Sequence, residues 1–563
     1  MLMILFAPSQ AVVFAETLIT SKEIQASGER MYREGILPNG KPIQSMVSAD
    51  VPVDGRMFTC VNCHQRSGLG SIEGSVITWP INGKELFTPR RRTGAWHAAK
   101  QKQGPGATQR WSLPTQYQAA DARPSYTSET LAKLLREGIA PDGRILSRAM
   151  PRYQIDDSNM EILIEYLKNL SIENDPGVDE KKIRFATVIT EGVSAEDKNA
   201  MLDVLKAHID THNIQTRPHK RRANSGPFYK TEQYGAYRQF ELDIWELSGP
   251  RNTWHSQLKT YYQNAPVFAM LGGIAKGSWD PIHHFCETKK IPCIFPITDQ
   301  PVISSTDWYT LYLSKGYYQE GNTTARYLRS AIKNNEITNV IQIYRKEEGK
   351  GAMLAQGFRE NLTKKGMIKI TEVILNEGDS IEEKLLQLPF KVQTTDTILL
   401  WLESNDMSAA TKWFEKQPQP PGVLFASWKQ LEGNTSVIAE KLHDKTYFTY
   451  PRDLPEDNLR KIKIVKRWLN NRKIPVTNLD IQSQMYFLGW MLPGAISHMR
   501  SEFFRDYFIE NFDMMHDQDY AIPVFPRLTF GPGQRYASKG SYIVKLDKDE
   551  QQNLVKKSEW IIH

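Results

Sequence analysis

From residue 183 onward, the chain alternates short apolar runs with stretches of helical periodicity. Each run has the length and the β-branched or aromatic content of a buried strand. Strands that alternate with helices are typical of parallel sheets in an α/β architecture. About 380 residues follow this rhythm, which exceeds one sheet, so we expect two α/β lobes over 183–563. The predicted strands are 183–190, 240–247, 267–273, 293–298, 340–344, 368–375, 397–403, 423–428 and 446–450.

Residues 22–171 have a helical pattern and are predicted to form a small all-α domain. In SNMEILIEYLKNL (158–170), Ser158 and Glu161 make a capping-box pattern, and apolar residues recur at helical spacing. The segment therefore predicts an amphipathic helix with Met160 in its core face.

Two further segments of this domain match each other in sequence. REGILPNGK (33–41) is echoed by REGIAPDGR (136–144), and each predicts a helix that ends at a glycine before a turn. After this domain, the polar stretch IENDPGVDEKK (172–182) is interpreted as a linker.

The first fifteen residues, MLMILFAPSQAVVFA, are apolar, and Val13 and Ala15 fit the small residues that precede a signal-peptidase cut. We interpret 1–15 as a signal peptide, with a buried N-terminal helix as the alternative. The run is short for a membrane span, and no later run reaches 18 apolar residues. We expect an exported, soluble, periplasmic protein that does not span the membrane.

Composition narrows the class of partner only a little. The 563 residues are 40% hydrophobic and 24% charged, with a formal net charge of +7, as in a soluble multidomain protein. Because this charge is modest and no concentrated basic face is evident, we expect no nucleic-acid partner.

The stretch FTCVNCHQRSGLG (58–70) contains Cys-x-x-Cys-His. This spacing is typical of haem attachment, in which Cys60 and Cys63 bond the porphyrin and His64 is the proximal iron ligand. Zinc needs further Cys or His ligands, and His97 is the only other histidine in the first 200 residues. A redox dithiol is expected after a strand of a βαβ unit, whereas this context is loop and helix. The pattern favours one covalently attached haem c.

A sixth ligand is expected downstream, and Met150 in RAMPRYQIDD is the best candidate. A thioether favours Fe(II), and His/Met ligation suits electron transfer. Met150 lies in a turn-rich loop where Pro151 restricts the chain. Core packing of Met150, ligation by His97 and an open site are the alternatives.

GERMYREGILPNG, FTCVNCHQRSGLG, YTSETLAKLLREGIAPDGR and AMPRYQIDDSNMEILIEYLKNL together resemble a class I mono-haem cytochrome c over 22–171. The resemblance implies a haem held by Cys60, Cys63, His64 and Met150, and a periplasmic redox partner such as a quinoprotein dehydrogenase. An insert around 80–123 departs from the family and contains TPRRRTGAWHAAKQKQ (88–103). This basic segment is either a solvated loop or a docking patch for an acidic partner.

From 183 onward, the chain resembles type I periplasmic binding proteins, the branched-chain amino-acid and amide receptors of ABC transporters. The resemblance rests on VFAMLGGIAKGSWDPIHHFCETKKIPCIFP (267–296), YTLYLSKGYYQEGNTTARYL (309–328) and FPRLTFGPGQRYASKGSYIVKL (525–546), a predicted extended hairpin. It implies two lobes that close over a small polar ligand. The ligand-contact candidates, for which turn and core roles are the alternative, are Gly272, Gly273, Ser278 and Trp279.

Cys286 and Cys293 are separated by a short Ile-Pro turn, and in an oxidising compartment we predict a disulfide between them, with two thiols as the alternative. No catalytic constellation stands out in 183–563, so we do not expect an enzyme. The sequence predicts an exported c-type cytochrome whose electron-transfer domain is joined to a solute-binding domain. The alternative is a solute receptor or sensor in which the haem is accessory.

Overall fold

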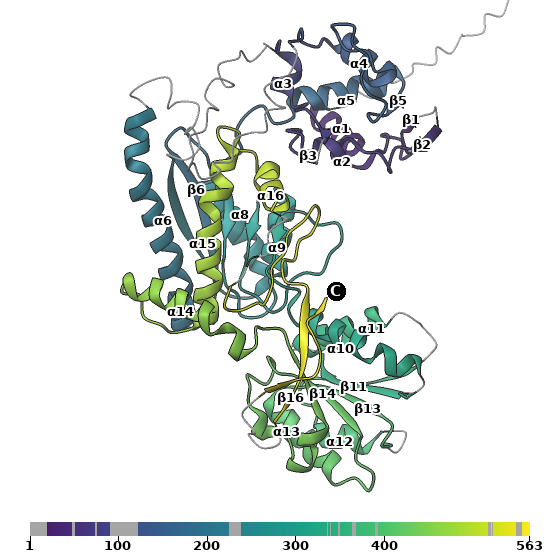
Figure 1. Ribbon diagram of the computed structural model, residues 1–563, viewed down its shortest axis with the longest axis vertical. Coiled ribbons are helices and arrows are strands. Elements are labelled where there is room, and N and C mark those ends of the chain that lie inside the picture. The colour runs from purple at the N-terminus through teal and green to yellow at the C-terminus, as the bar shows by residue number, and fades with distance from the viewer. Residues whose placement is uncertain are drawn as a thin grey trace, which may run out of the picture. The chain divides into compact units, whose positions relative to one another are not determined.

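The computed structural model describes residues 20–47, 51–73, 76–90, 122–223, 238–334, 336–337, 339–346, 349–362, 368–388, 392–515, 520, 522–547 and 554–562. The predicted signal peptide 1–15, His97 and most of the basic segment 88–103 lie outside these residues. The chain divides into two compact units, Met1–Asn174 and Asp175–His563 (Figure 1). Within the described residues, no helix is both long and apolar enough to cross a membrane.

The first unit is built around the packing of α1 (Ser21–Glu34) against α5 (Asp157–Asn169). Gly28 permits the close approach, because a Cβ at this position would lie 2.3 Å from Cβ of Tyr166. Met160 is buried in the core, as predicted. The other helices are α2 (Cys60–His64), α3 (Gly83–Phe87) and α4 (Ser128–Glu137).

The first unit is not purely helical, which corrects the predicted all-α class. It contains a three-stranded antiparallel sheet of order β2-β1-β5 and a two-stranded pair, β3-β4. The strands are two to four residues long, too short for a visible alternation of apolar and polar residues. Their bounds are β1 Gln44–Val47, β2 Val51–Asp54, β3 Ile72–Glu73, β4 Val76–Ile77 and β5 Arg152–Gln154.

The two matching segments, 33–41 and 136–144, form similar helix ends. Gly35 and Gly138 end α1 and α4 in the left-handed region, with φ of 68° and 79°, which glycine adopts without strain. The predicted capping box at Ser158 is wrong. Asp156 is the N-cap of α5, since its carboxylate accepts a hydrogen bond from the backbone N–H of Asn159.

The first lobe of the second unit is a five-stranded parallel sheet of order β10-β9-β8-β6-β7. Apolar residues of α6 and α15 form one core with the sheet, and residues of α8 and α9 form another. The sheet is thus covered on both faces, as expected for parallel strands. The elements are β6 Lys182–Thr190, α6 Ala195–Ala223, β7 Gln239–Leu247, η4 Arg251–Thr253, α8 Trp254–Asn264, β8 Ala269–Leu271, α9 Asp280–Lys289, β9 Cys293–Ile294, β10 Thr310–Leu311, α14 Pro455–Asn471, α15 Leu479–Met499 and α16 Arg505–Asp513.

The second lobe is a mixed sheet of order β12-β11-β13-β14-β15-β16-β17, with β18 paired to β16. Its first five strands are parallel, and β16 joins antiparallel to β15. Cores with α12 and α13 on one face and α10 and α11 on the other cover it. Its helices are α10 Gly316–Lys333, α11 Lys350–Asn361, α12 Ile381–Leu386, α13 Ser404–Glu415, η5 Thr435–Val437 and η6 Glu440–Lys445. Its strands are β11 Asn339–Arg345, β12 Lys369–Leu375, β13 Thr397–Trp401, β14 Val423–Ser427, β15 Thr446–Tyr450, β16 Gly540–Leu546, β17 Leu554–Lys556 and β18 Ile561–Ile562.

The chain crosses between the two lobes three times. The crossings follow β10, follow β15 and precede β16. The first and third are hydrogen-bonded to each other, with the N–H of Ser538 donating to the carbonyl of Leu313 at 2.7 Å. The second is tied to a first-lobe segment by the N–H of Asp453, which donates to the carbonyl of Val524 at 3.1 Å. The lobes are therefore joined by a narrow, hydrogen-bonded hinge region.

The predicted linker 172–182 is not a free connection, because from Asp175 onward it is packed into the second unit. Asp175 accepts a hydrogen bond from the backbone N–H of Arg505 at 2.7 Å, and its own N–H donates to the carbonyl of Phe503 at 3.0 Å. The buried Arg505 side chain in turn donates to the carbonyls of Val267 and Phe268. The polar sequence of the segment reflects these specific bonds rather than full exposure to solvent.

Candidate functional site

The Cys-x-x-Cys-His motif forms the short helix α2 in the first unit. The backbone carbonyl of Trp79 lies 3.0 Å from Nδ1 of His64. A carbonyl oxygen only accepts hydrogen bonds, so Nδ1 carries the proton and Nε2 keeps its lone pair. Desolvation lowers the pKa of His64 to about 4, although the bond to Trp79 opposes this shift. His64 is thus a neutral imidazole with its ring orientation fixed through Nδ1.

The predicted sulfur groups pack against one apolar cluster of the first unit. Cys60 and Met150 are both half-buried against the cluster that contains Leu131 and Leu163. Met150 lies in a bend, and its carbonyl accepts a hydrogen bond from Arg152 Nη1 at 2.6 Å. Cys60 and Met150, which are 90 positions apart in the sequence, thus pack against the same cluster.

These residues fit a covalently attached haem better than a reactive dithiol or a zinc ion. Burial raises the pKa of the Cys60 thiol to about 11, whereas reactive thiols have lowered pKa values. Within the described residues, no group of three or more His, Cys, Asp or Glu side chains is placed to hold a metal ion. Cys60 and Cys63 would form the thioether bonds, and His64 and Met150 would ligate the iron. A bound haem supplies one-electron redox chemistry.

The predicted Cys286–Cys293 disulfide is not formed in the structure. Both cysteines are fully buried, and Cys286 Sγ lies 3.5 Å from Sδ of Met270. Burial, together with the neighbouring Cys293, raises the pKa of Cys286. The two side chains are near neighbours in an apolar core, where each packs as a small hydrophobic thiol.

The four predicted ligand-contact residues have different places in the first lobe. Gly272 and Gly273 form the turn after β8, with φ of 58° and 95°, and a Cβ on either would collide with Met485 or Trp279. Trp279 is fully buried in the core beside α9, which favours the core alternative. Ser278 lines an open pocket together with His255, His284 and residues of the second lobe. The structure thus brings only Ser278 to that pocket.

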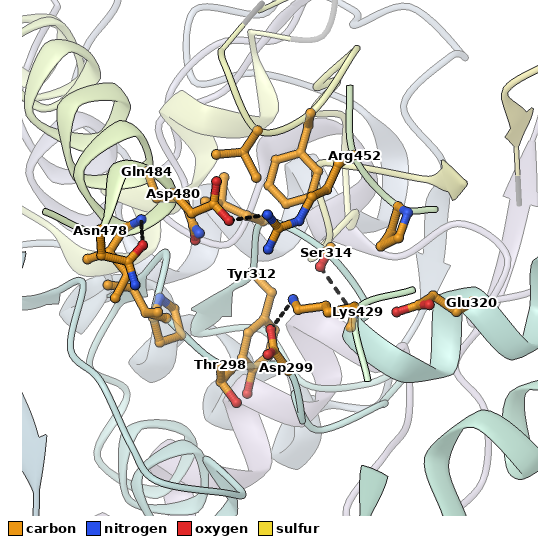
Figure 2. A pocket seen from close by; sticks show the side chains of 18 residues that line it. Thr298, Asp299, Tyr312, Ser314, Glu320, Lys429, Arg452, Asn478, Asp480 and Gln484 are labelled. Atoms are coloured by element: carbon orange, nitrogen blue, oxygen red, sulfur yellow. Dashed lines mark hydrogen bonds and ion pairs between the residues drawn. The ribbon is translucent and has the colours of Figure 1, made fainter. Parts of the chain in front are cut away.

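A second pocket lies in the hinge region, between the carboxyl ends of strands from both lobes (Figure 2). Its volume is about 190 Å³. The segments after β9 and β10 contribute from the first lobe, and those after β14 and β15 contribute from the second. Ligands bind at such strand ends in open α/β sheets. The lining residues with polar or charged side chains are Thr298, Asp299, Tyr312, Ser314, Glu320, Lys429, Arg452, Asn478, Asp480 and Gln484.

The charges of this pocket are mostly paired. The Lys429 ammonium forms an ion pair with Asp299, and this pair joins the two lobes. The Arg452 guanidinium forms an ion pair with Asp480 at the start of α15 (Figure 2). Glu320, on the first turns of α10, is the remaining acid of the lining, and burial raises its pKa to about 7.

Sequence reasoning missed these five charged residues. Asp299, Lys429 and Arg452 each follow a predicted strand by one or two residues, so the rule that sites lie at strand ends would have selected them. Glu320 and Asp480 carry a weaker signal, because a charged residue on a helix is usually solvated. Only the fold shows that both helices begin at the pocket.

No family model matches the chain, and no curated protein matches it. Among solved structures, the chain is similar to a fatty acid ABC transporter substrate-binding protein from Thermomonospora curvata, at 14% identity and TM-score 0.43, covering 69% of this chain and 95% of that one. It is also similar to a leucine-binding protein from Thermotoga maritima, at 12% identity and TM-score 0.44, covering 67% and 98%. A third is a solute-binding protein from R. palustris in complex with benzoate, at 12% identity and TM-score 0.45, covering 68% and 98%.

Proposed function

We propose that the second unit is a solute-binding domain, and that the first unit carries one covalently attached haem c. In this proposal the chain is an exported, periplasmic solute receptor with an attached redox unit. A small molecule is the partner of the second unit, and a soluble electron carrier or dehydrogenase is the partner of the first.

The observation that carries the solute-binding function is the position of the hinge-region pocket. Residues of two of the three crossings between the lobes line it, among them Tyr312, Ser314 and Arg452. The third crossing is hydrogen-bonded to the first. Any rotation of the lobes about these crossings changes the pocket, which is the physical requirement for closure around a ligand.

A thermal-shift screen of amines, alcohols, amides, amino acids and aromatic acids tests this function. A ligand present at 100 times its Kd adds about 2.7 kcal/mol to the stability of the domain that binds it. We expect at least one class to raise the unfolding temperature of the second unit, with binding confirmed by calorimetry. Failure of every class to bind would reject the solute-binding function.

The haem is a second proposed function, favoured by the geometry of His64. Its Nδ1 is held by the Trp79 carbonyl, as metal-ligating histidines are commonly held through their other nitrogen. We expect a reduced-minus-oxidised spectrum of a low-spin c-type haem, and we expect the haem itself to stay attached to the chain after denaturation.

Replacing Met150 tests the sixth ligand. Met150→Ala should open the site, allow CO to bind and lower the reduction potential, because the thioether stabilises Fe(II). Met57→Ala, which removes an exposed methionine of the same unit, is the matched control and should leave the spectrum unchanged. CO binding by the unaltered protein, or an unchanged spectrum in Met150→Ala, would reject Met150 as the ligand.

A further inference from the structure

The inference concerns Glu320, the acid that closes one side of the hinge-region pocket. Its side chain is completely buried, and its carboxylate is directed toward the Lys429 side of the pocket (Figure 2). One oxygen, Oε2, accepts hydrogen bonds from the Ser427 hydroxyl at 2.7 Å and the Thr449 hydroxyl at 2.6 Å. The other oxygen, Oε1, is buried and has no hydrogen-bond partner among the described residues.

An unpartnered, buried carboxylate oxygen is energetically costly, because the water it loses on burial is not replaced. Burial is the main cause that raises the pKa of Glu320, and the pKa is still about 7 although the hydrogen bonds from Thr449 and Ser427 lower it. The charged groups that act on Glu320 are Lys429, which lowers the pKa, and Asp299, which raises it. A hydrogen-bond donor placed against Oε1 would reduce this cost, and a cationic donor would reduce it more than a neutral donor.

Among its described lining residues, the pocket offers no basic side chain outside an ion pair for a ligand carboxylate. Among the residues that line it, the basic side chains are Lys429 and Arg452, and each is in an ion pair with an acid of the lining. A zwitterionic ligand would have to break one of these pairs to place its carboxylate. A ligand with an ammonium group and no carboxylate meets the unpartnered Oε1 without that loss.

We propose that the hinge-region pocket binds a small primary amine in its ammonium form, with the ammonium donating to Oε1 of Glu320 and no carboxylate on the ligand. This ligand class rests on the solute-binding function proposed above. This ligand class differs from that of an amino-acid receptor, which recognises the ammonium and the carboxylate of its ligand together.

Three probes of matched shape test the class by calorimetry on the full-length protein at pH 8: 3-methylbutylamine, 3-methylbutan-1-ol and leucine. The amine and leucine differ by the carboxylate, and the amine and the alcohol differ by the charged donor. Ethylamine is added as a smaller amine. We expect at least one amine to bind at least 10-fold more tightly than the alcohol and leucine. Tighter binding of the alcohol or of leucine, or no binding of either amine, overturns the inference.

Glu320→Gln keeps the shape of the side chain and removes its charge. It should weaken amine binding by roughly 10- to 100-fold, the range for loss of a hydrogen bond to a charged group. Glu377→Gln, at an exposed position remote from the pocket, is the matched control and should bind as the unaltered protein does. Equal amine affinity in Glu320→Gln and the control overturns the inference.

The pH dependence of the unaltered protein gives a measurement that needs no variant. Because the ammonium pairs with the ionised carboxylate, amine affinity should rise between pH 5.5 and 8 and then level off. A flat profile overturns the inference. If the amines fail and another class in the wider screen binds, the solute-binding function stands without the amine. If every class fails, the solute-binding function itself is rejected.

Discussion

In the first unit, Cys60, Cys63 and His64 lie within one short helix, whereas in the second unit the charged side chains of the pocket come from three strand ends and two helices. The first arrangement depends on local backbone geometry and on one carbonyl, that of Trp79. The second depends on how two lobes are held by their crossings. Because the two sites are built in different ways, damage to one site should leave the other intact. The pocket of the second unit should be the more sensitive of the two to changes in packing.

The largest expected effect tests this independence. His64→Ala should abolish the visible spectrum of the low-spin haem, because the proximal ligand is lost. The affinity of the second unit for its ligand should stay within about twofold, because the two sites have no residue in common and effects at independent sites are additive. The reciprocal variant Glu320→Gln should leave the haem spectrum unchanged. Loss of ligand binding in His64→Ala would show that the two sites are coupled.

The next effect concerns packing in the core of the first lobe of the second unit. Trp279→Ala should destabilise the second unit by about 3–5 kcal/mol, because it empties a large part of a fully buried core. Chemical denaturation followed by far-UV circular dichroism measures this loss. Ser278→Ala removes only a hydroxyl that accepts from the N–H of Asp280 at 3.2 Å, and should cost about 1 kcal/mol or less. Equal effects at the two positions would show that Trp279 is not a core residue.

A smaller effect follows from the pKa of Glu320, about 7 when folded and near 4.5 when unfolded. Between these values the folded state binds the extra proton, so stability falls as pH rises from 4.5 to 7 and is then constant. The difference corresponds to about 3 kcal/mol. Unfolding midpoints at pH 5 and pH 8 should therefore differ less in Glu320→Gln than in the unaltered protein. The comparison between the two proteins isolates Glu320 from other buried acids, such as Asp175 and Asp453, whose pKa values are also raised.

The smallest expected effect concerns Cys286 and Cys293. As buried thiols, they should resist alkylation in the native protein and react fully in denaturant without reductant. Reductant should then change the free energy of unfolding by no more than about 0.5 kcal/mol. Labelling that requires reductant in denaturant would instead establish the disulfide predicted from the sequence.

Much of the fold could be predicted from the sequence. All nine predicted strands between 183 and 450 overlap observed strands, and the helix predicted at 158–170 is α5 shifted by one residue. These elements have strong periodicity, which survives whatever the tertiary context is. The short strands β1 and β5 carry no such pattern, and the N-cap at Asp156 competed with an equally plausible signal at Ser158.

The candidate sites divide in the same way. The haem residues remain a prediction. Cys60, Cys63 and His64 were selected by their local spacing, and Met150 was selected by its position in a turn-rich loop. The pocket could not be predicted, because Asp299 and Lys429 are 130 positions apart and meet only after the lobes are joined. For Trp279 the structure favours the core alternative that the sequence left open, since a turn sequence does not show which of its side chains point into the core.

The bonds that Asp175 makes with Arg505 and Phe503 set the limits of any separable fragment. A fragment cut at Ile183, where the sequence predicts the first strand of this unit, would lack Asp175 and the Pro176 carbonyl that accepts from Arg505 Nη2 at 3.3 Å. The guanidinium of Arg505 is buried, so the cut would leave part of it without acceptors. A fragment meant to fold as an independent second unit should therefore begin at Asp175 or earlier. A fusion point or an engineered protease site should likewise be placed at the Asn174–Asp175 junction or before it.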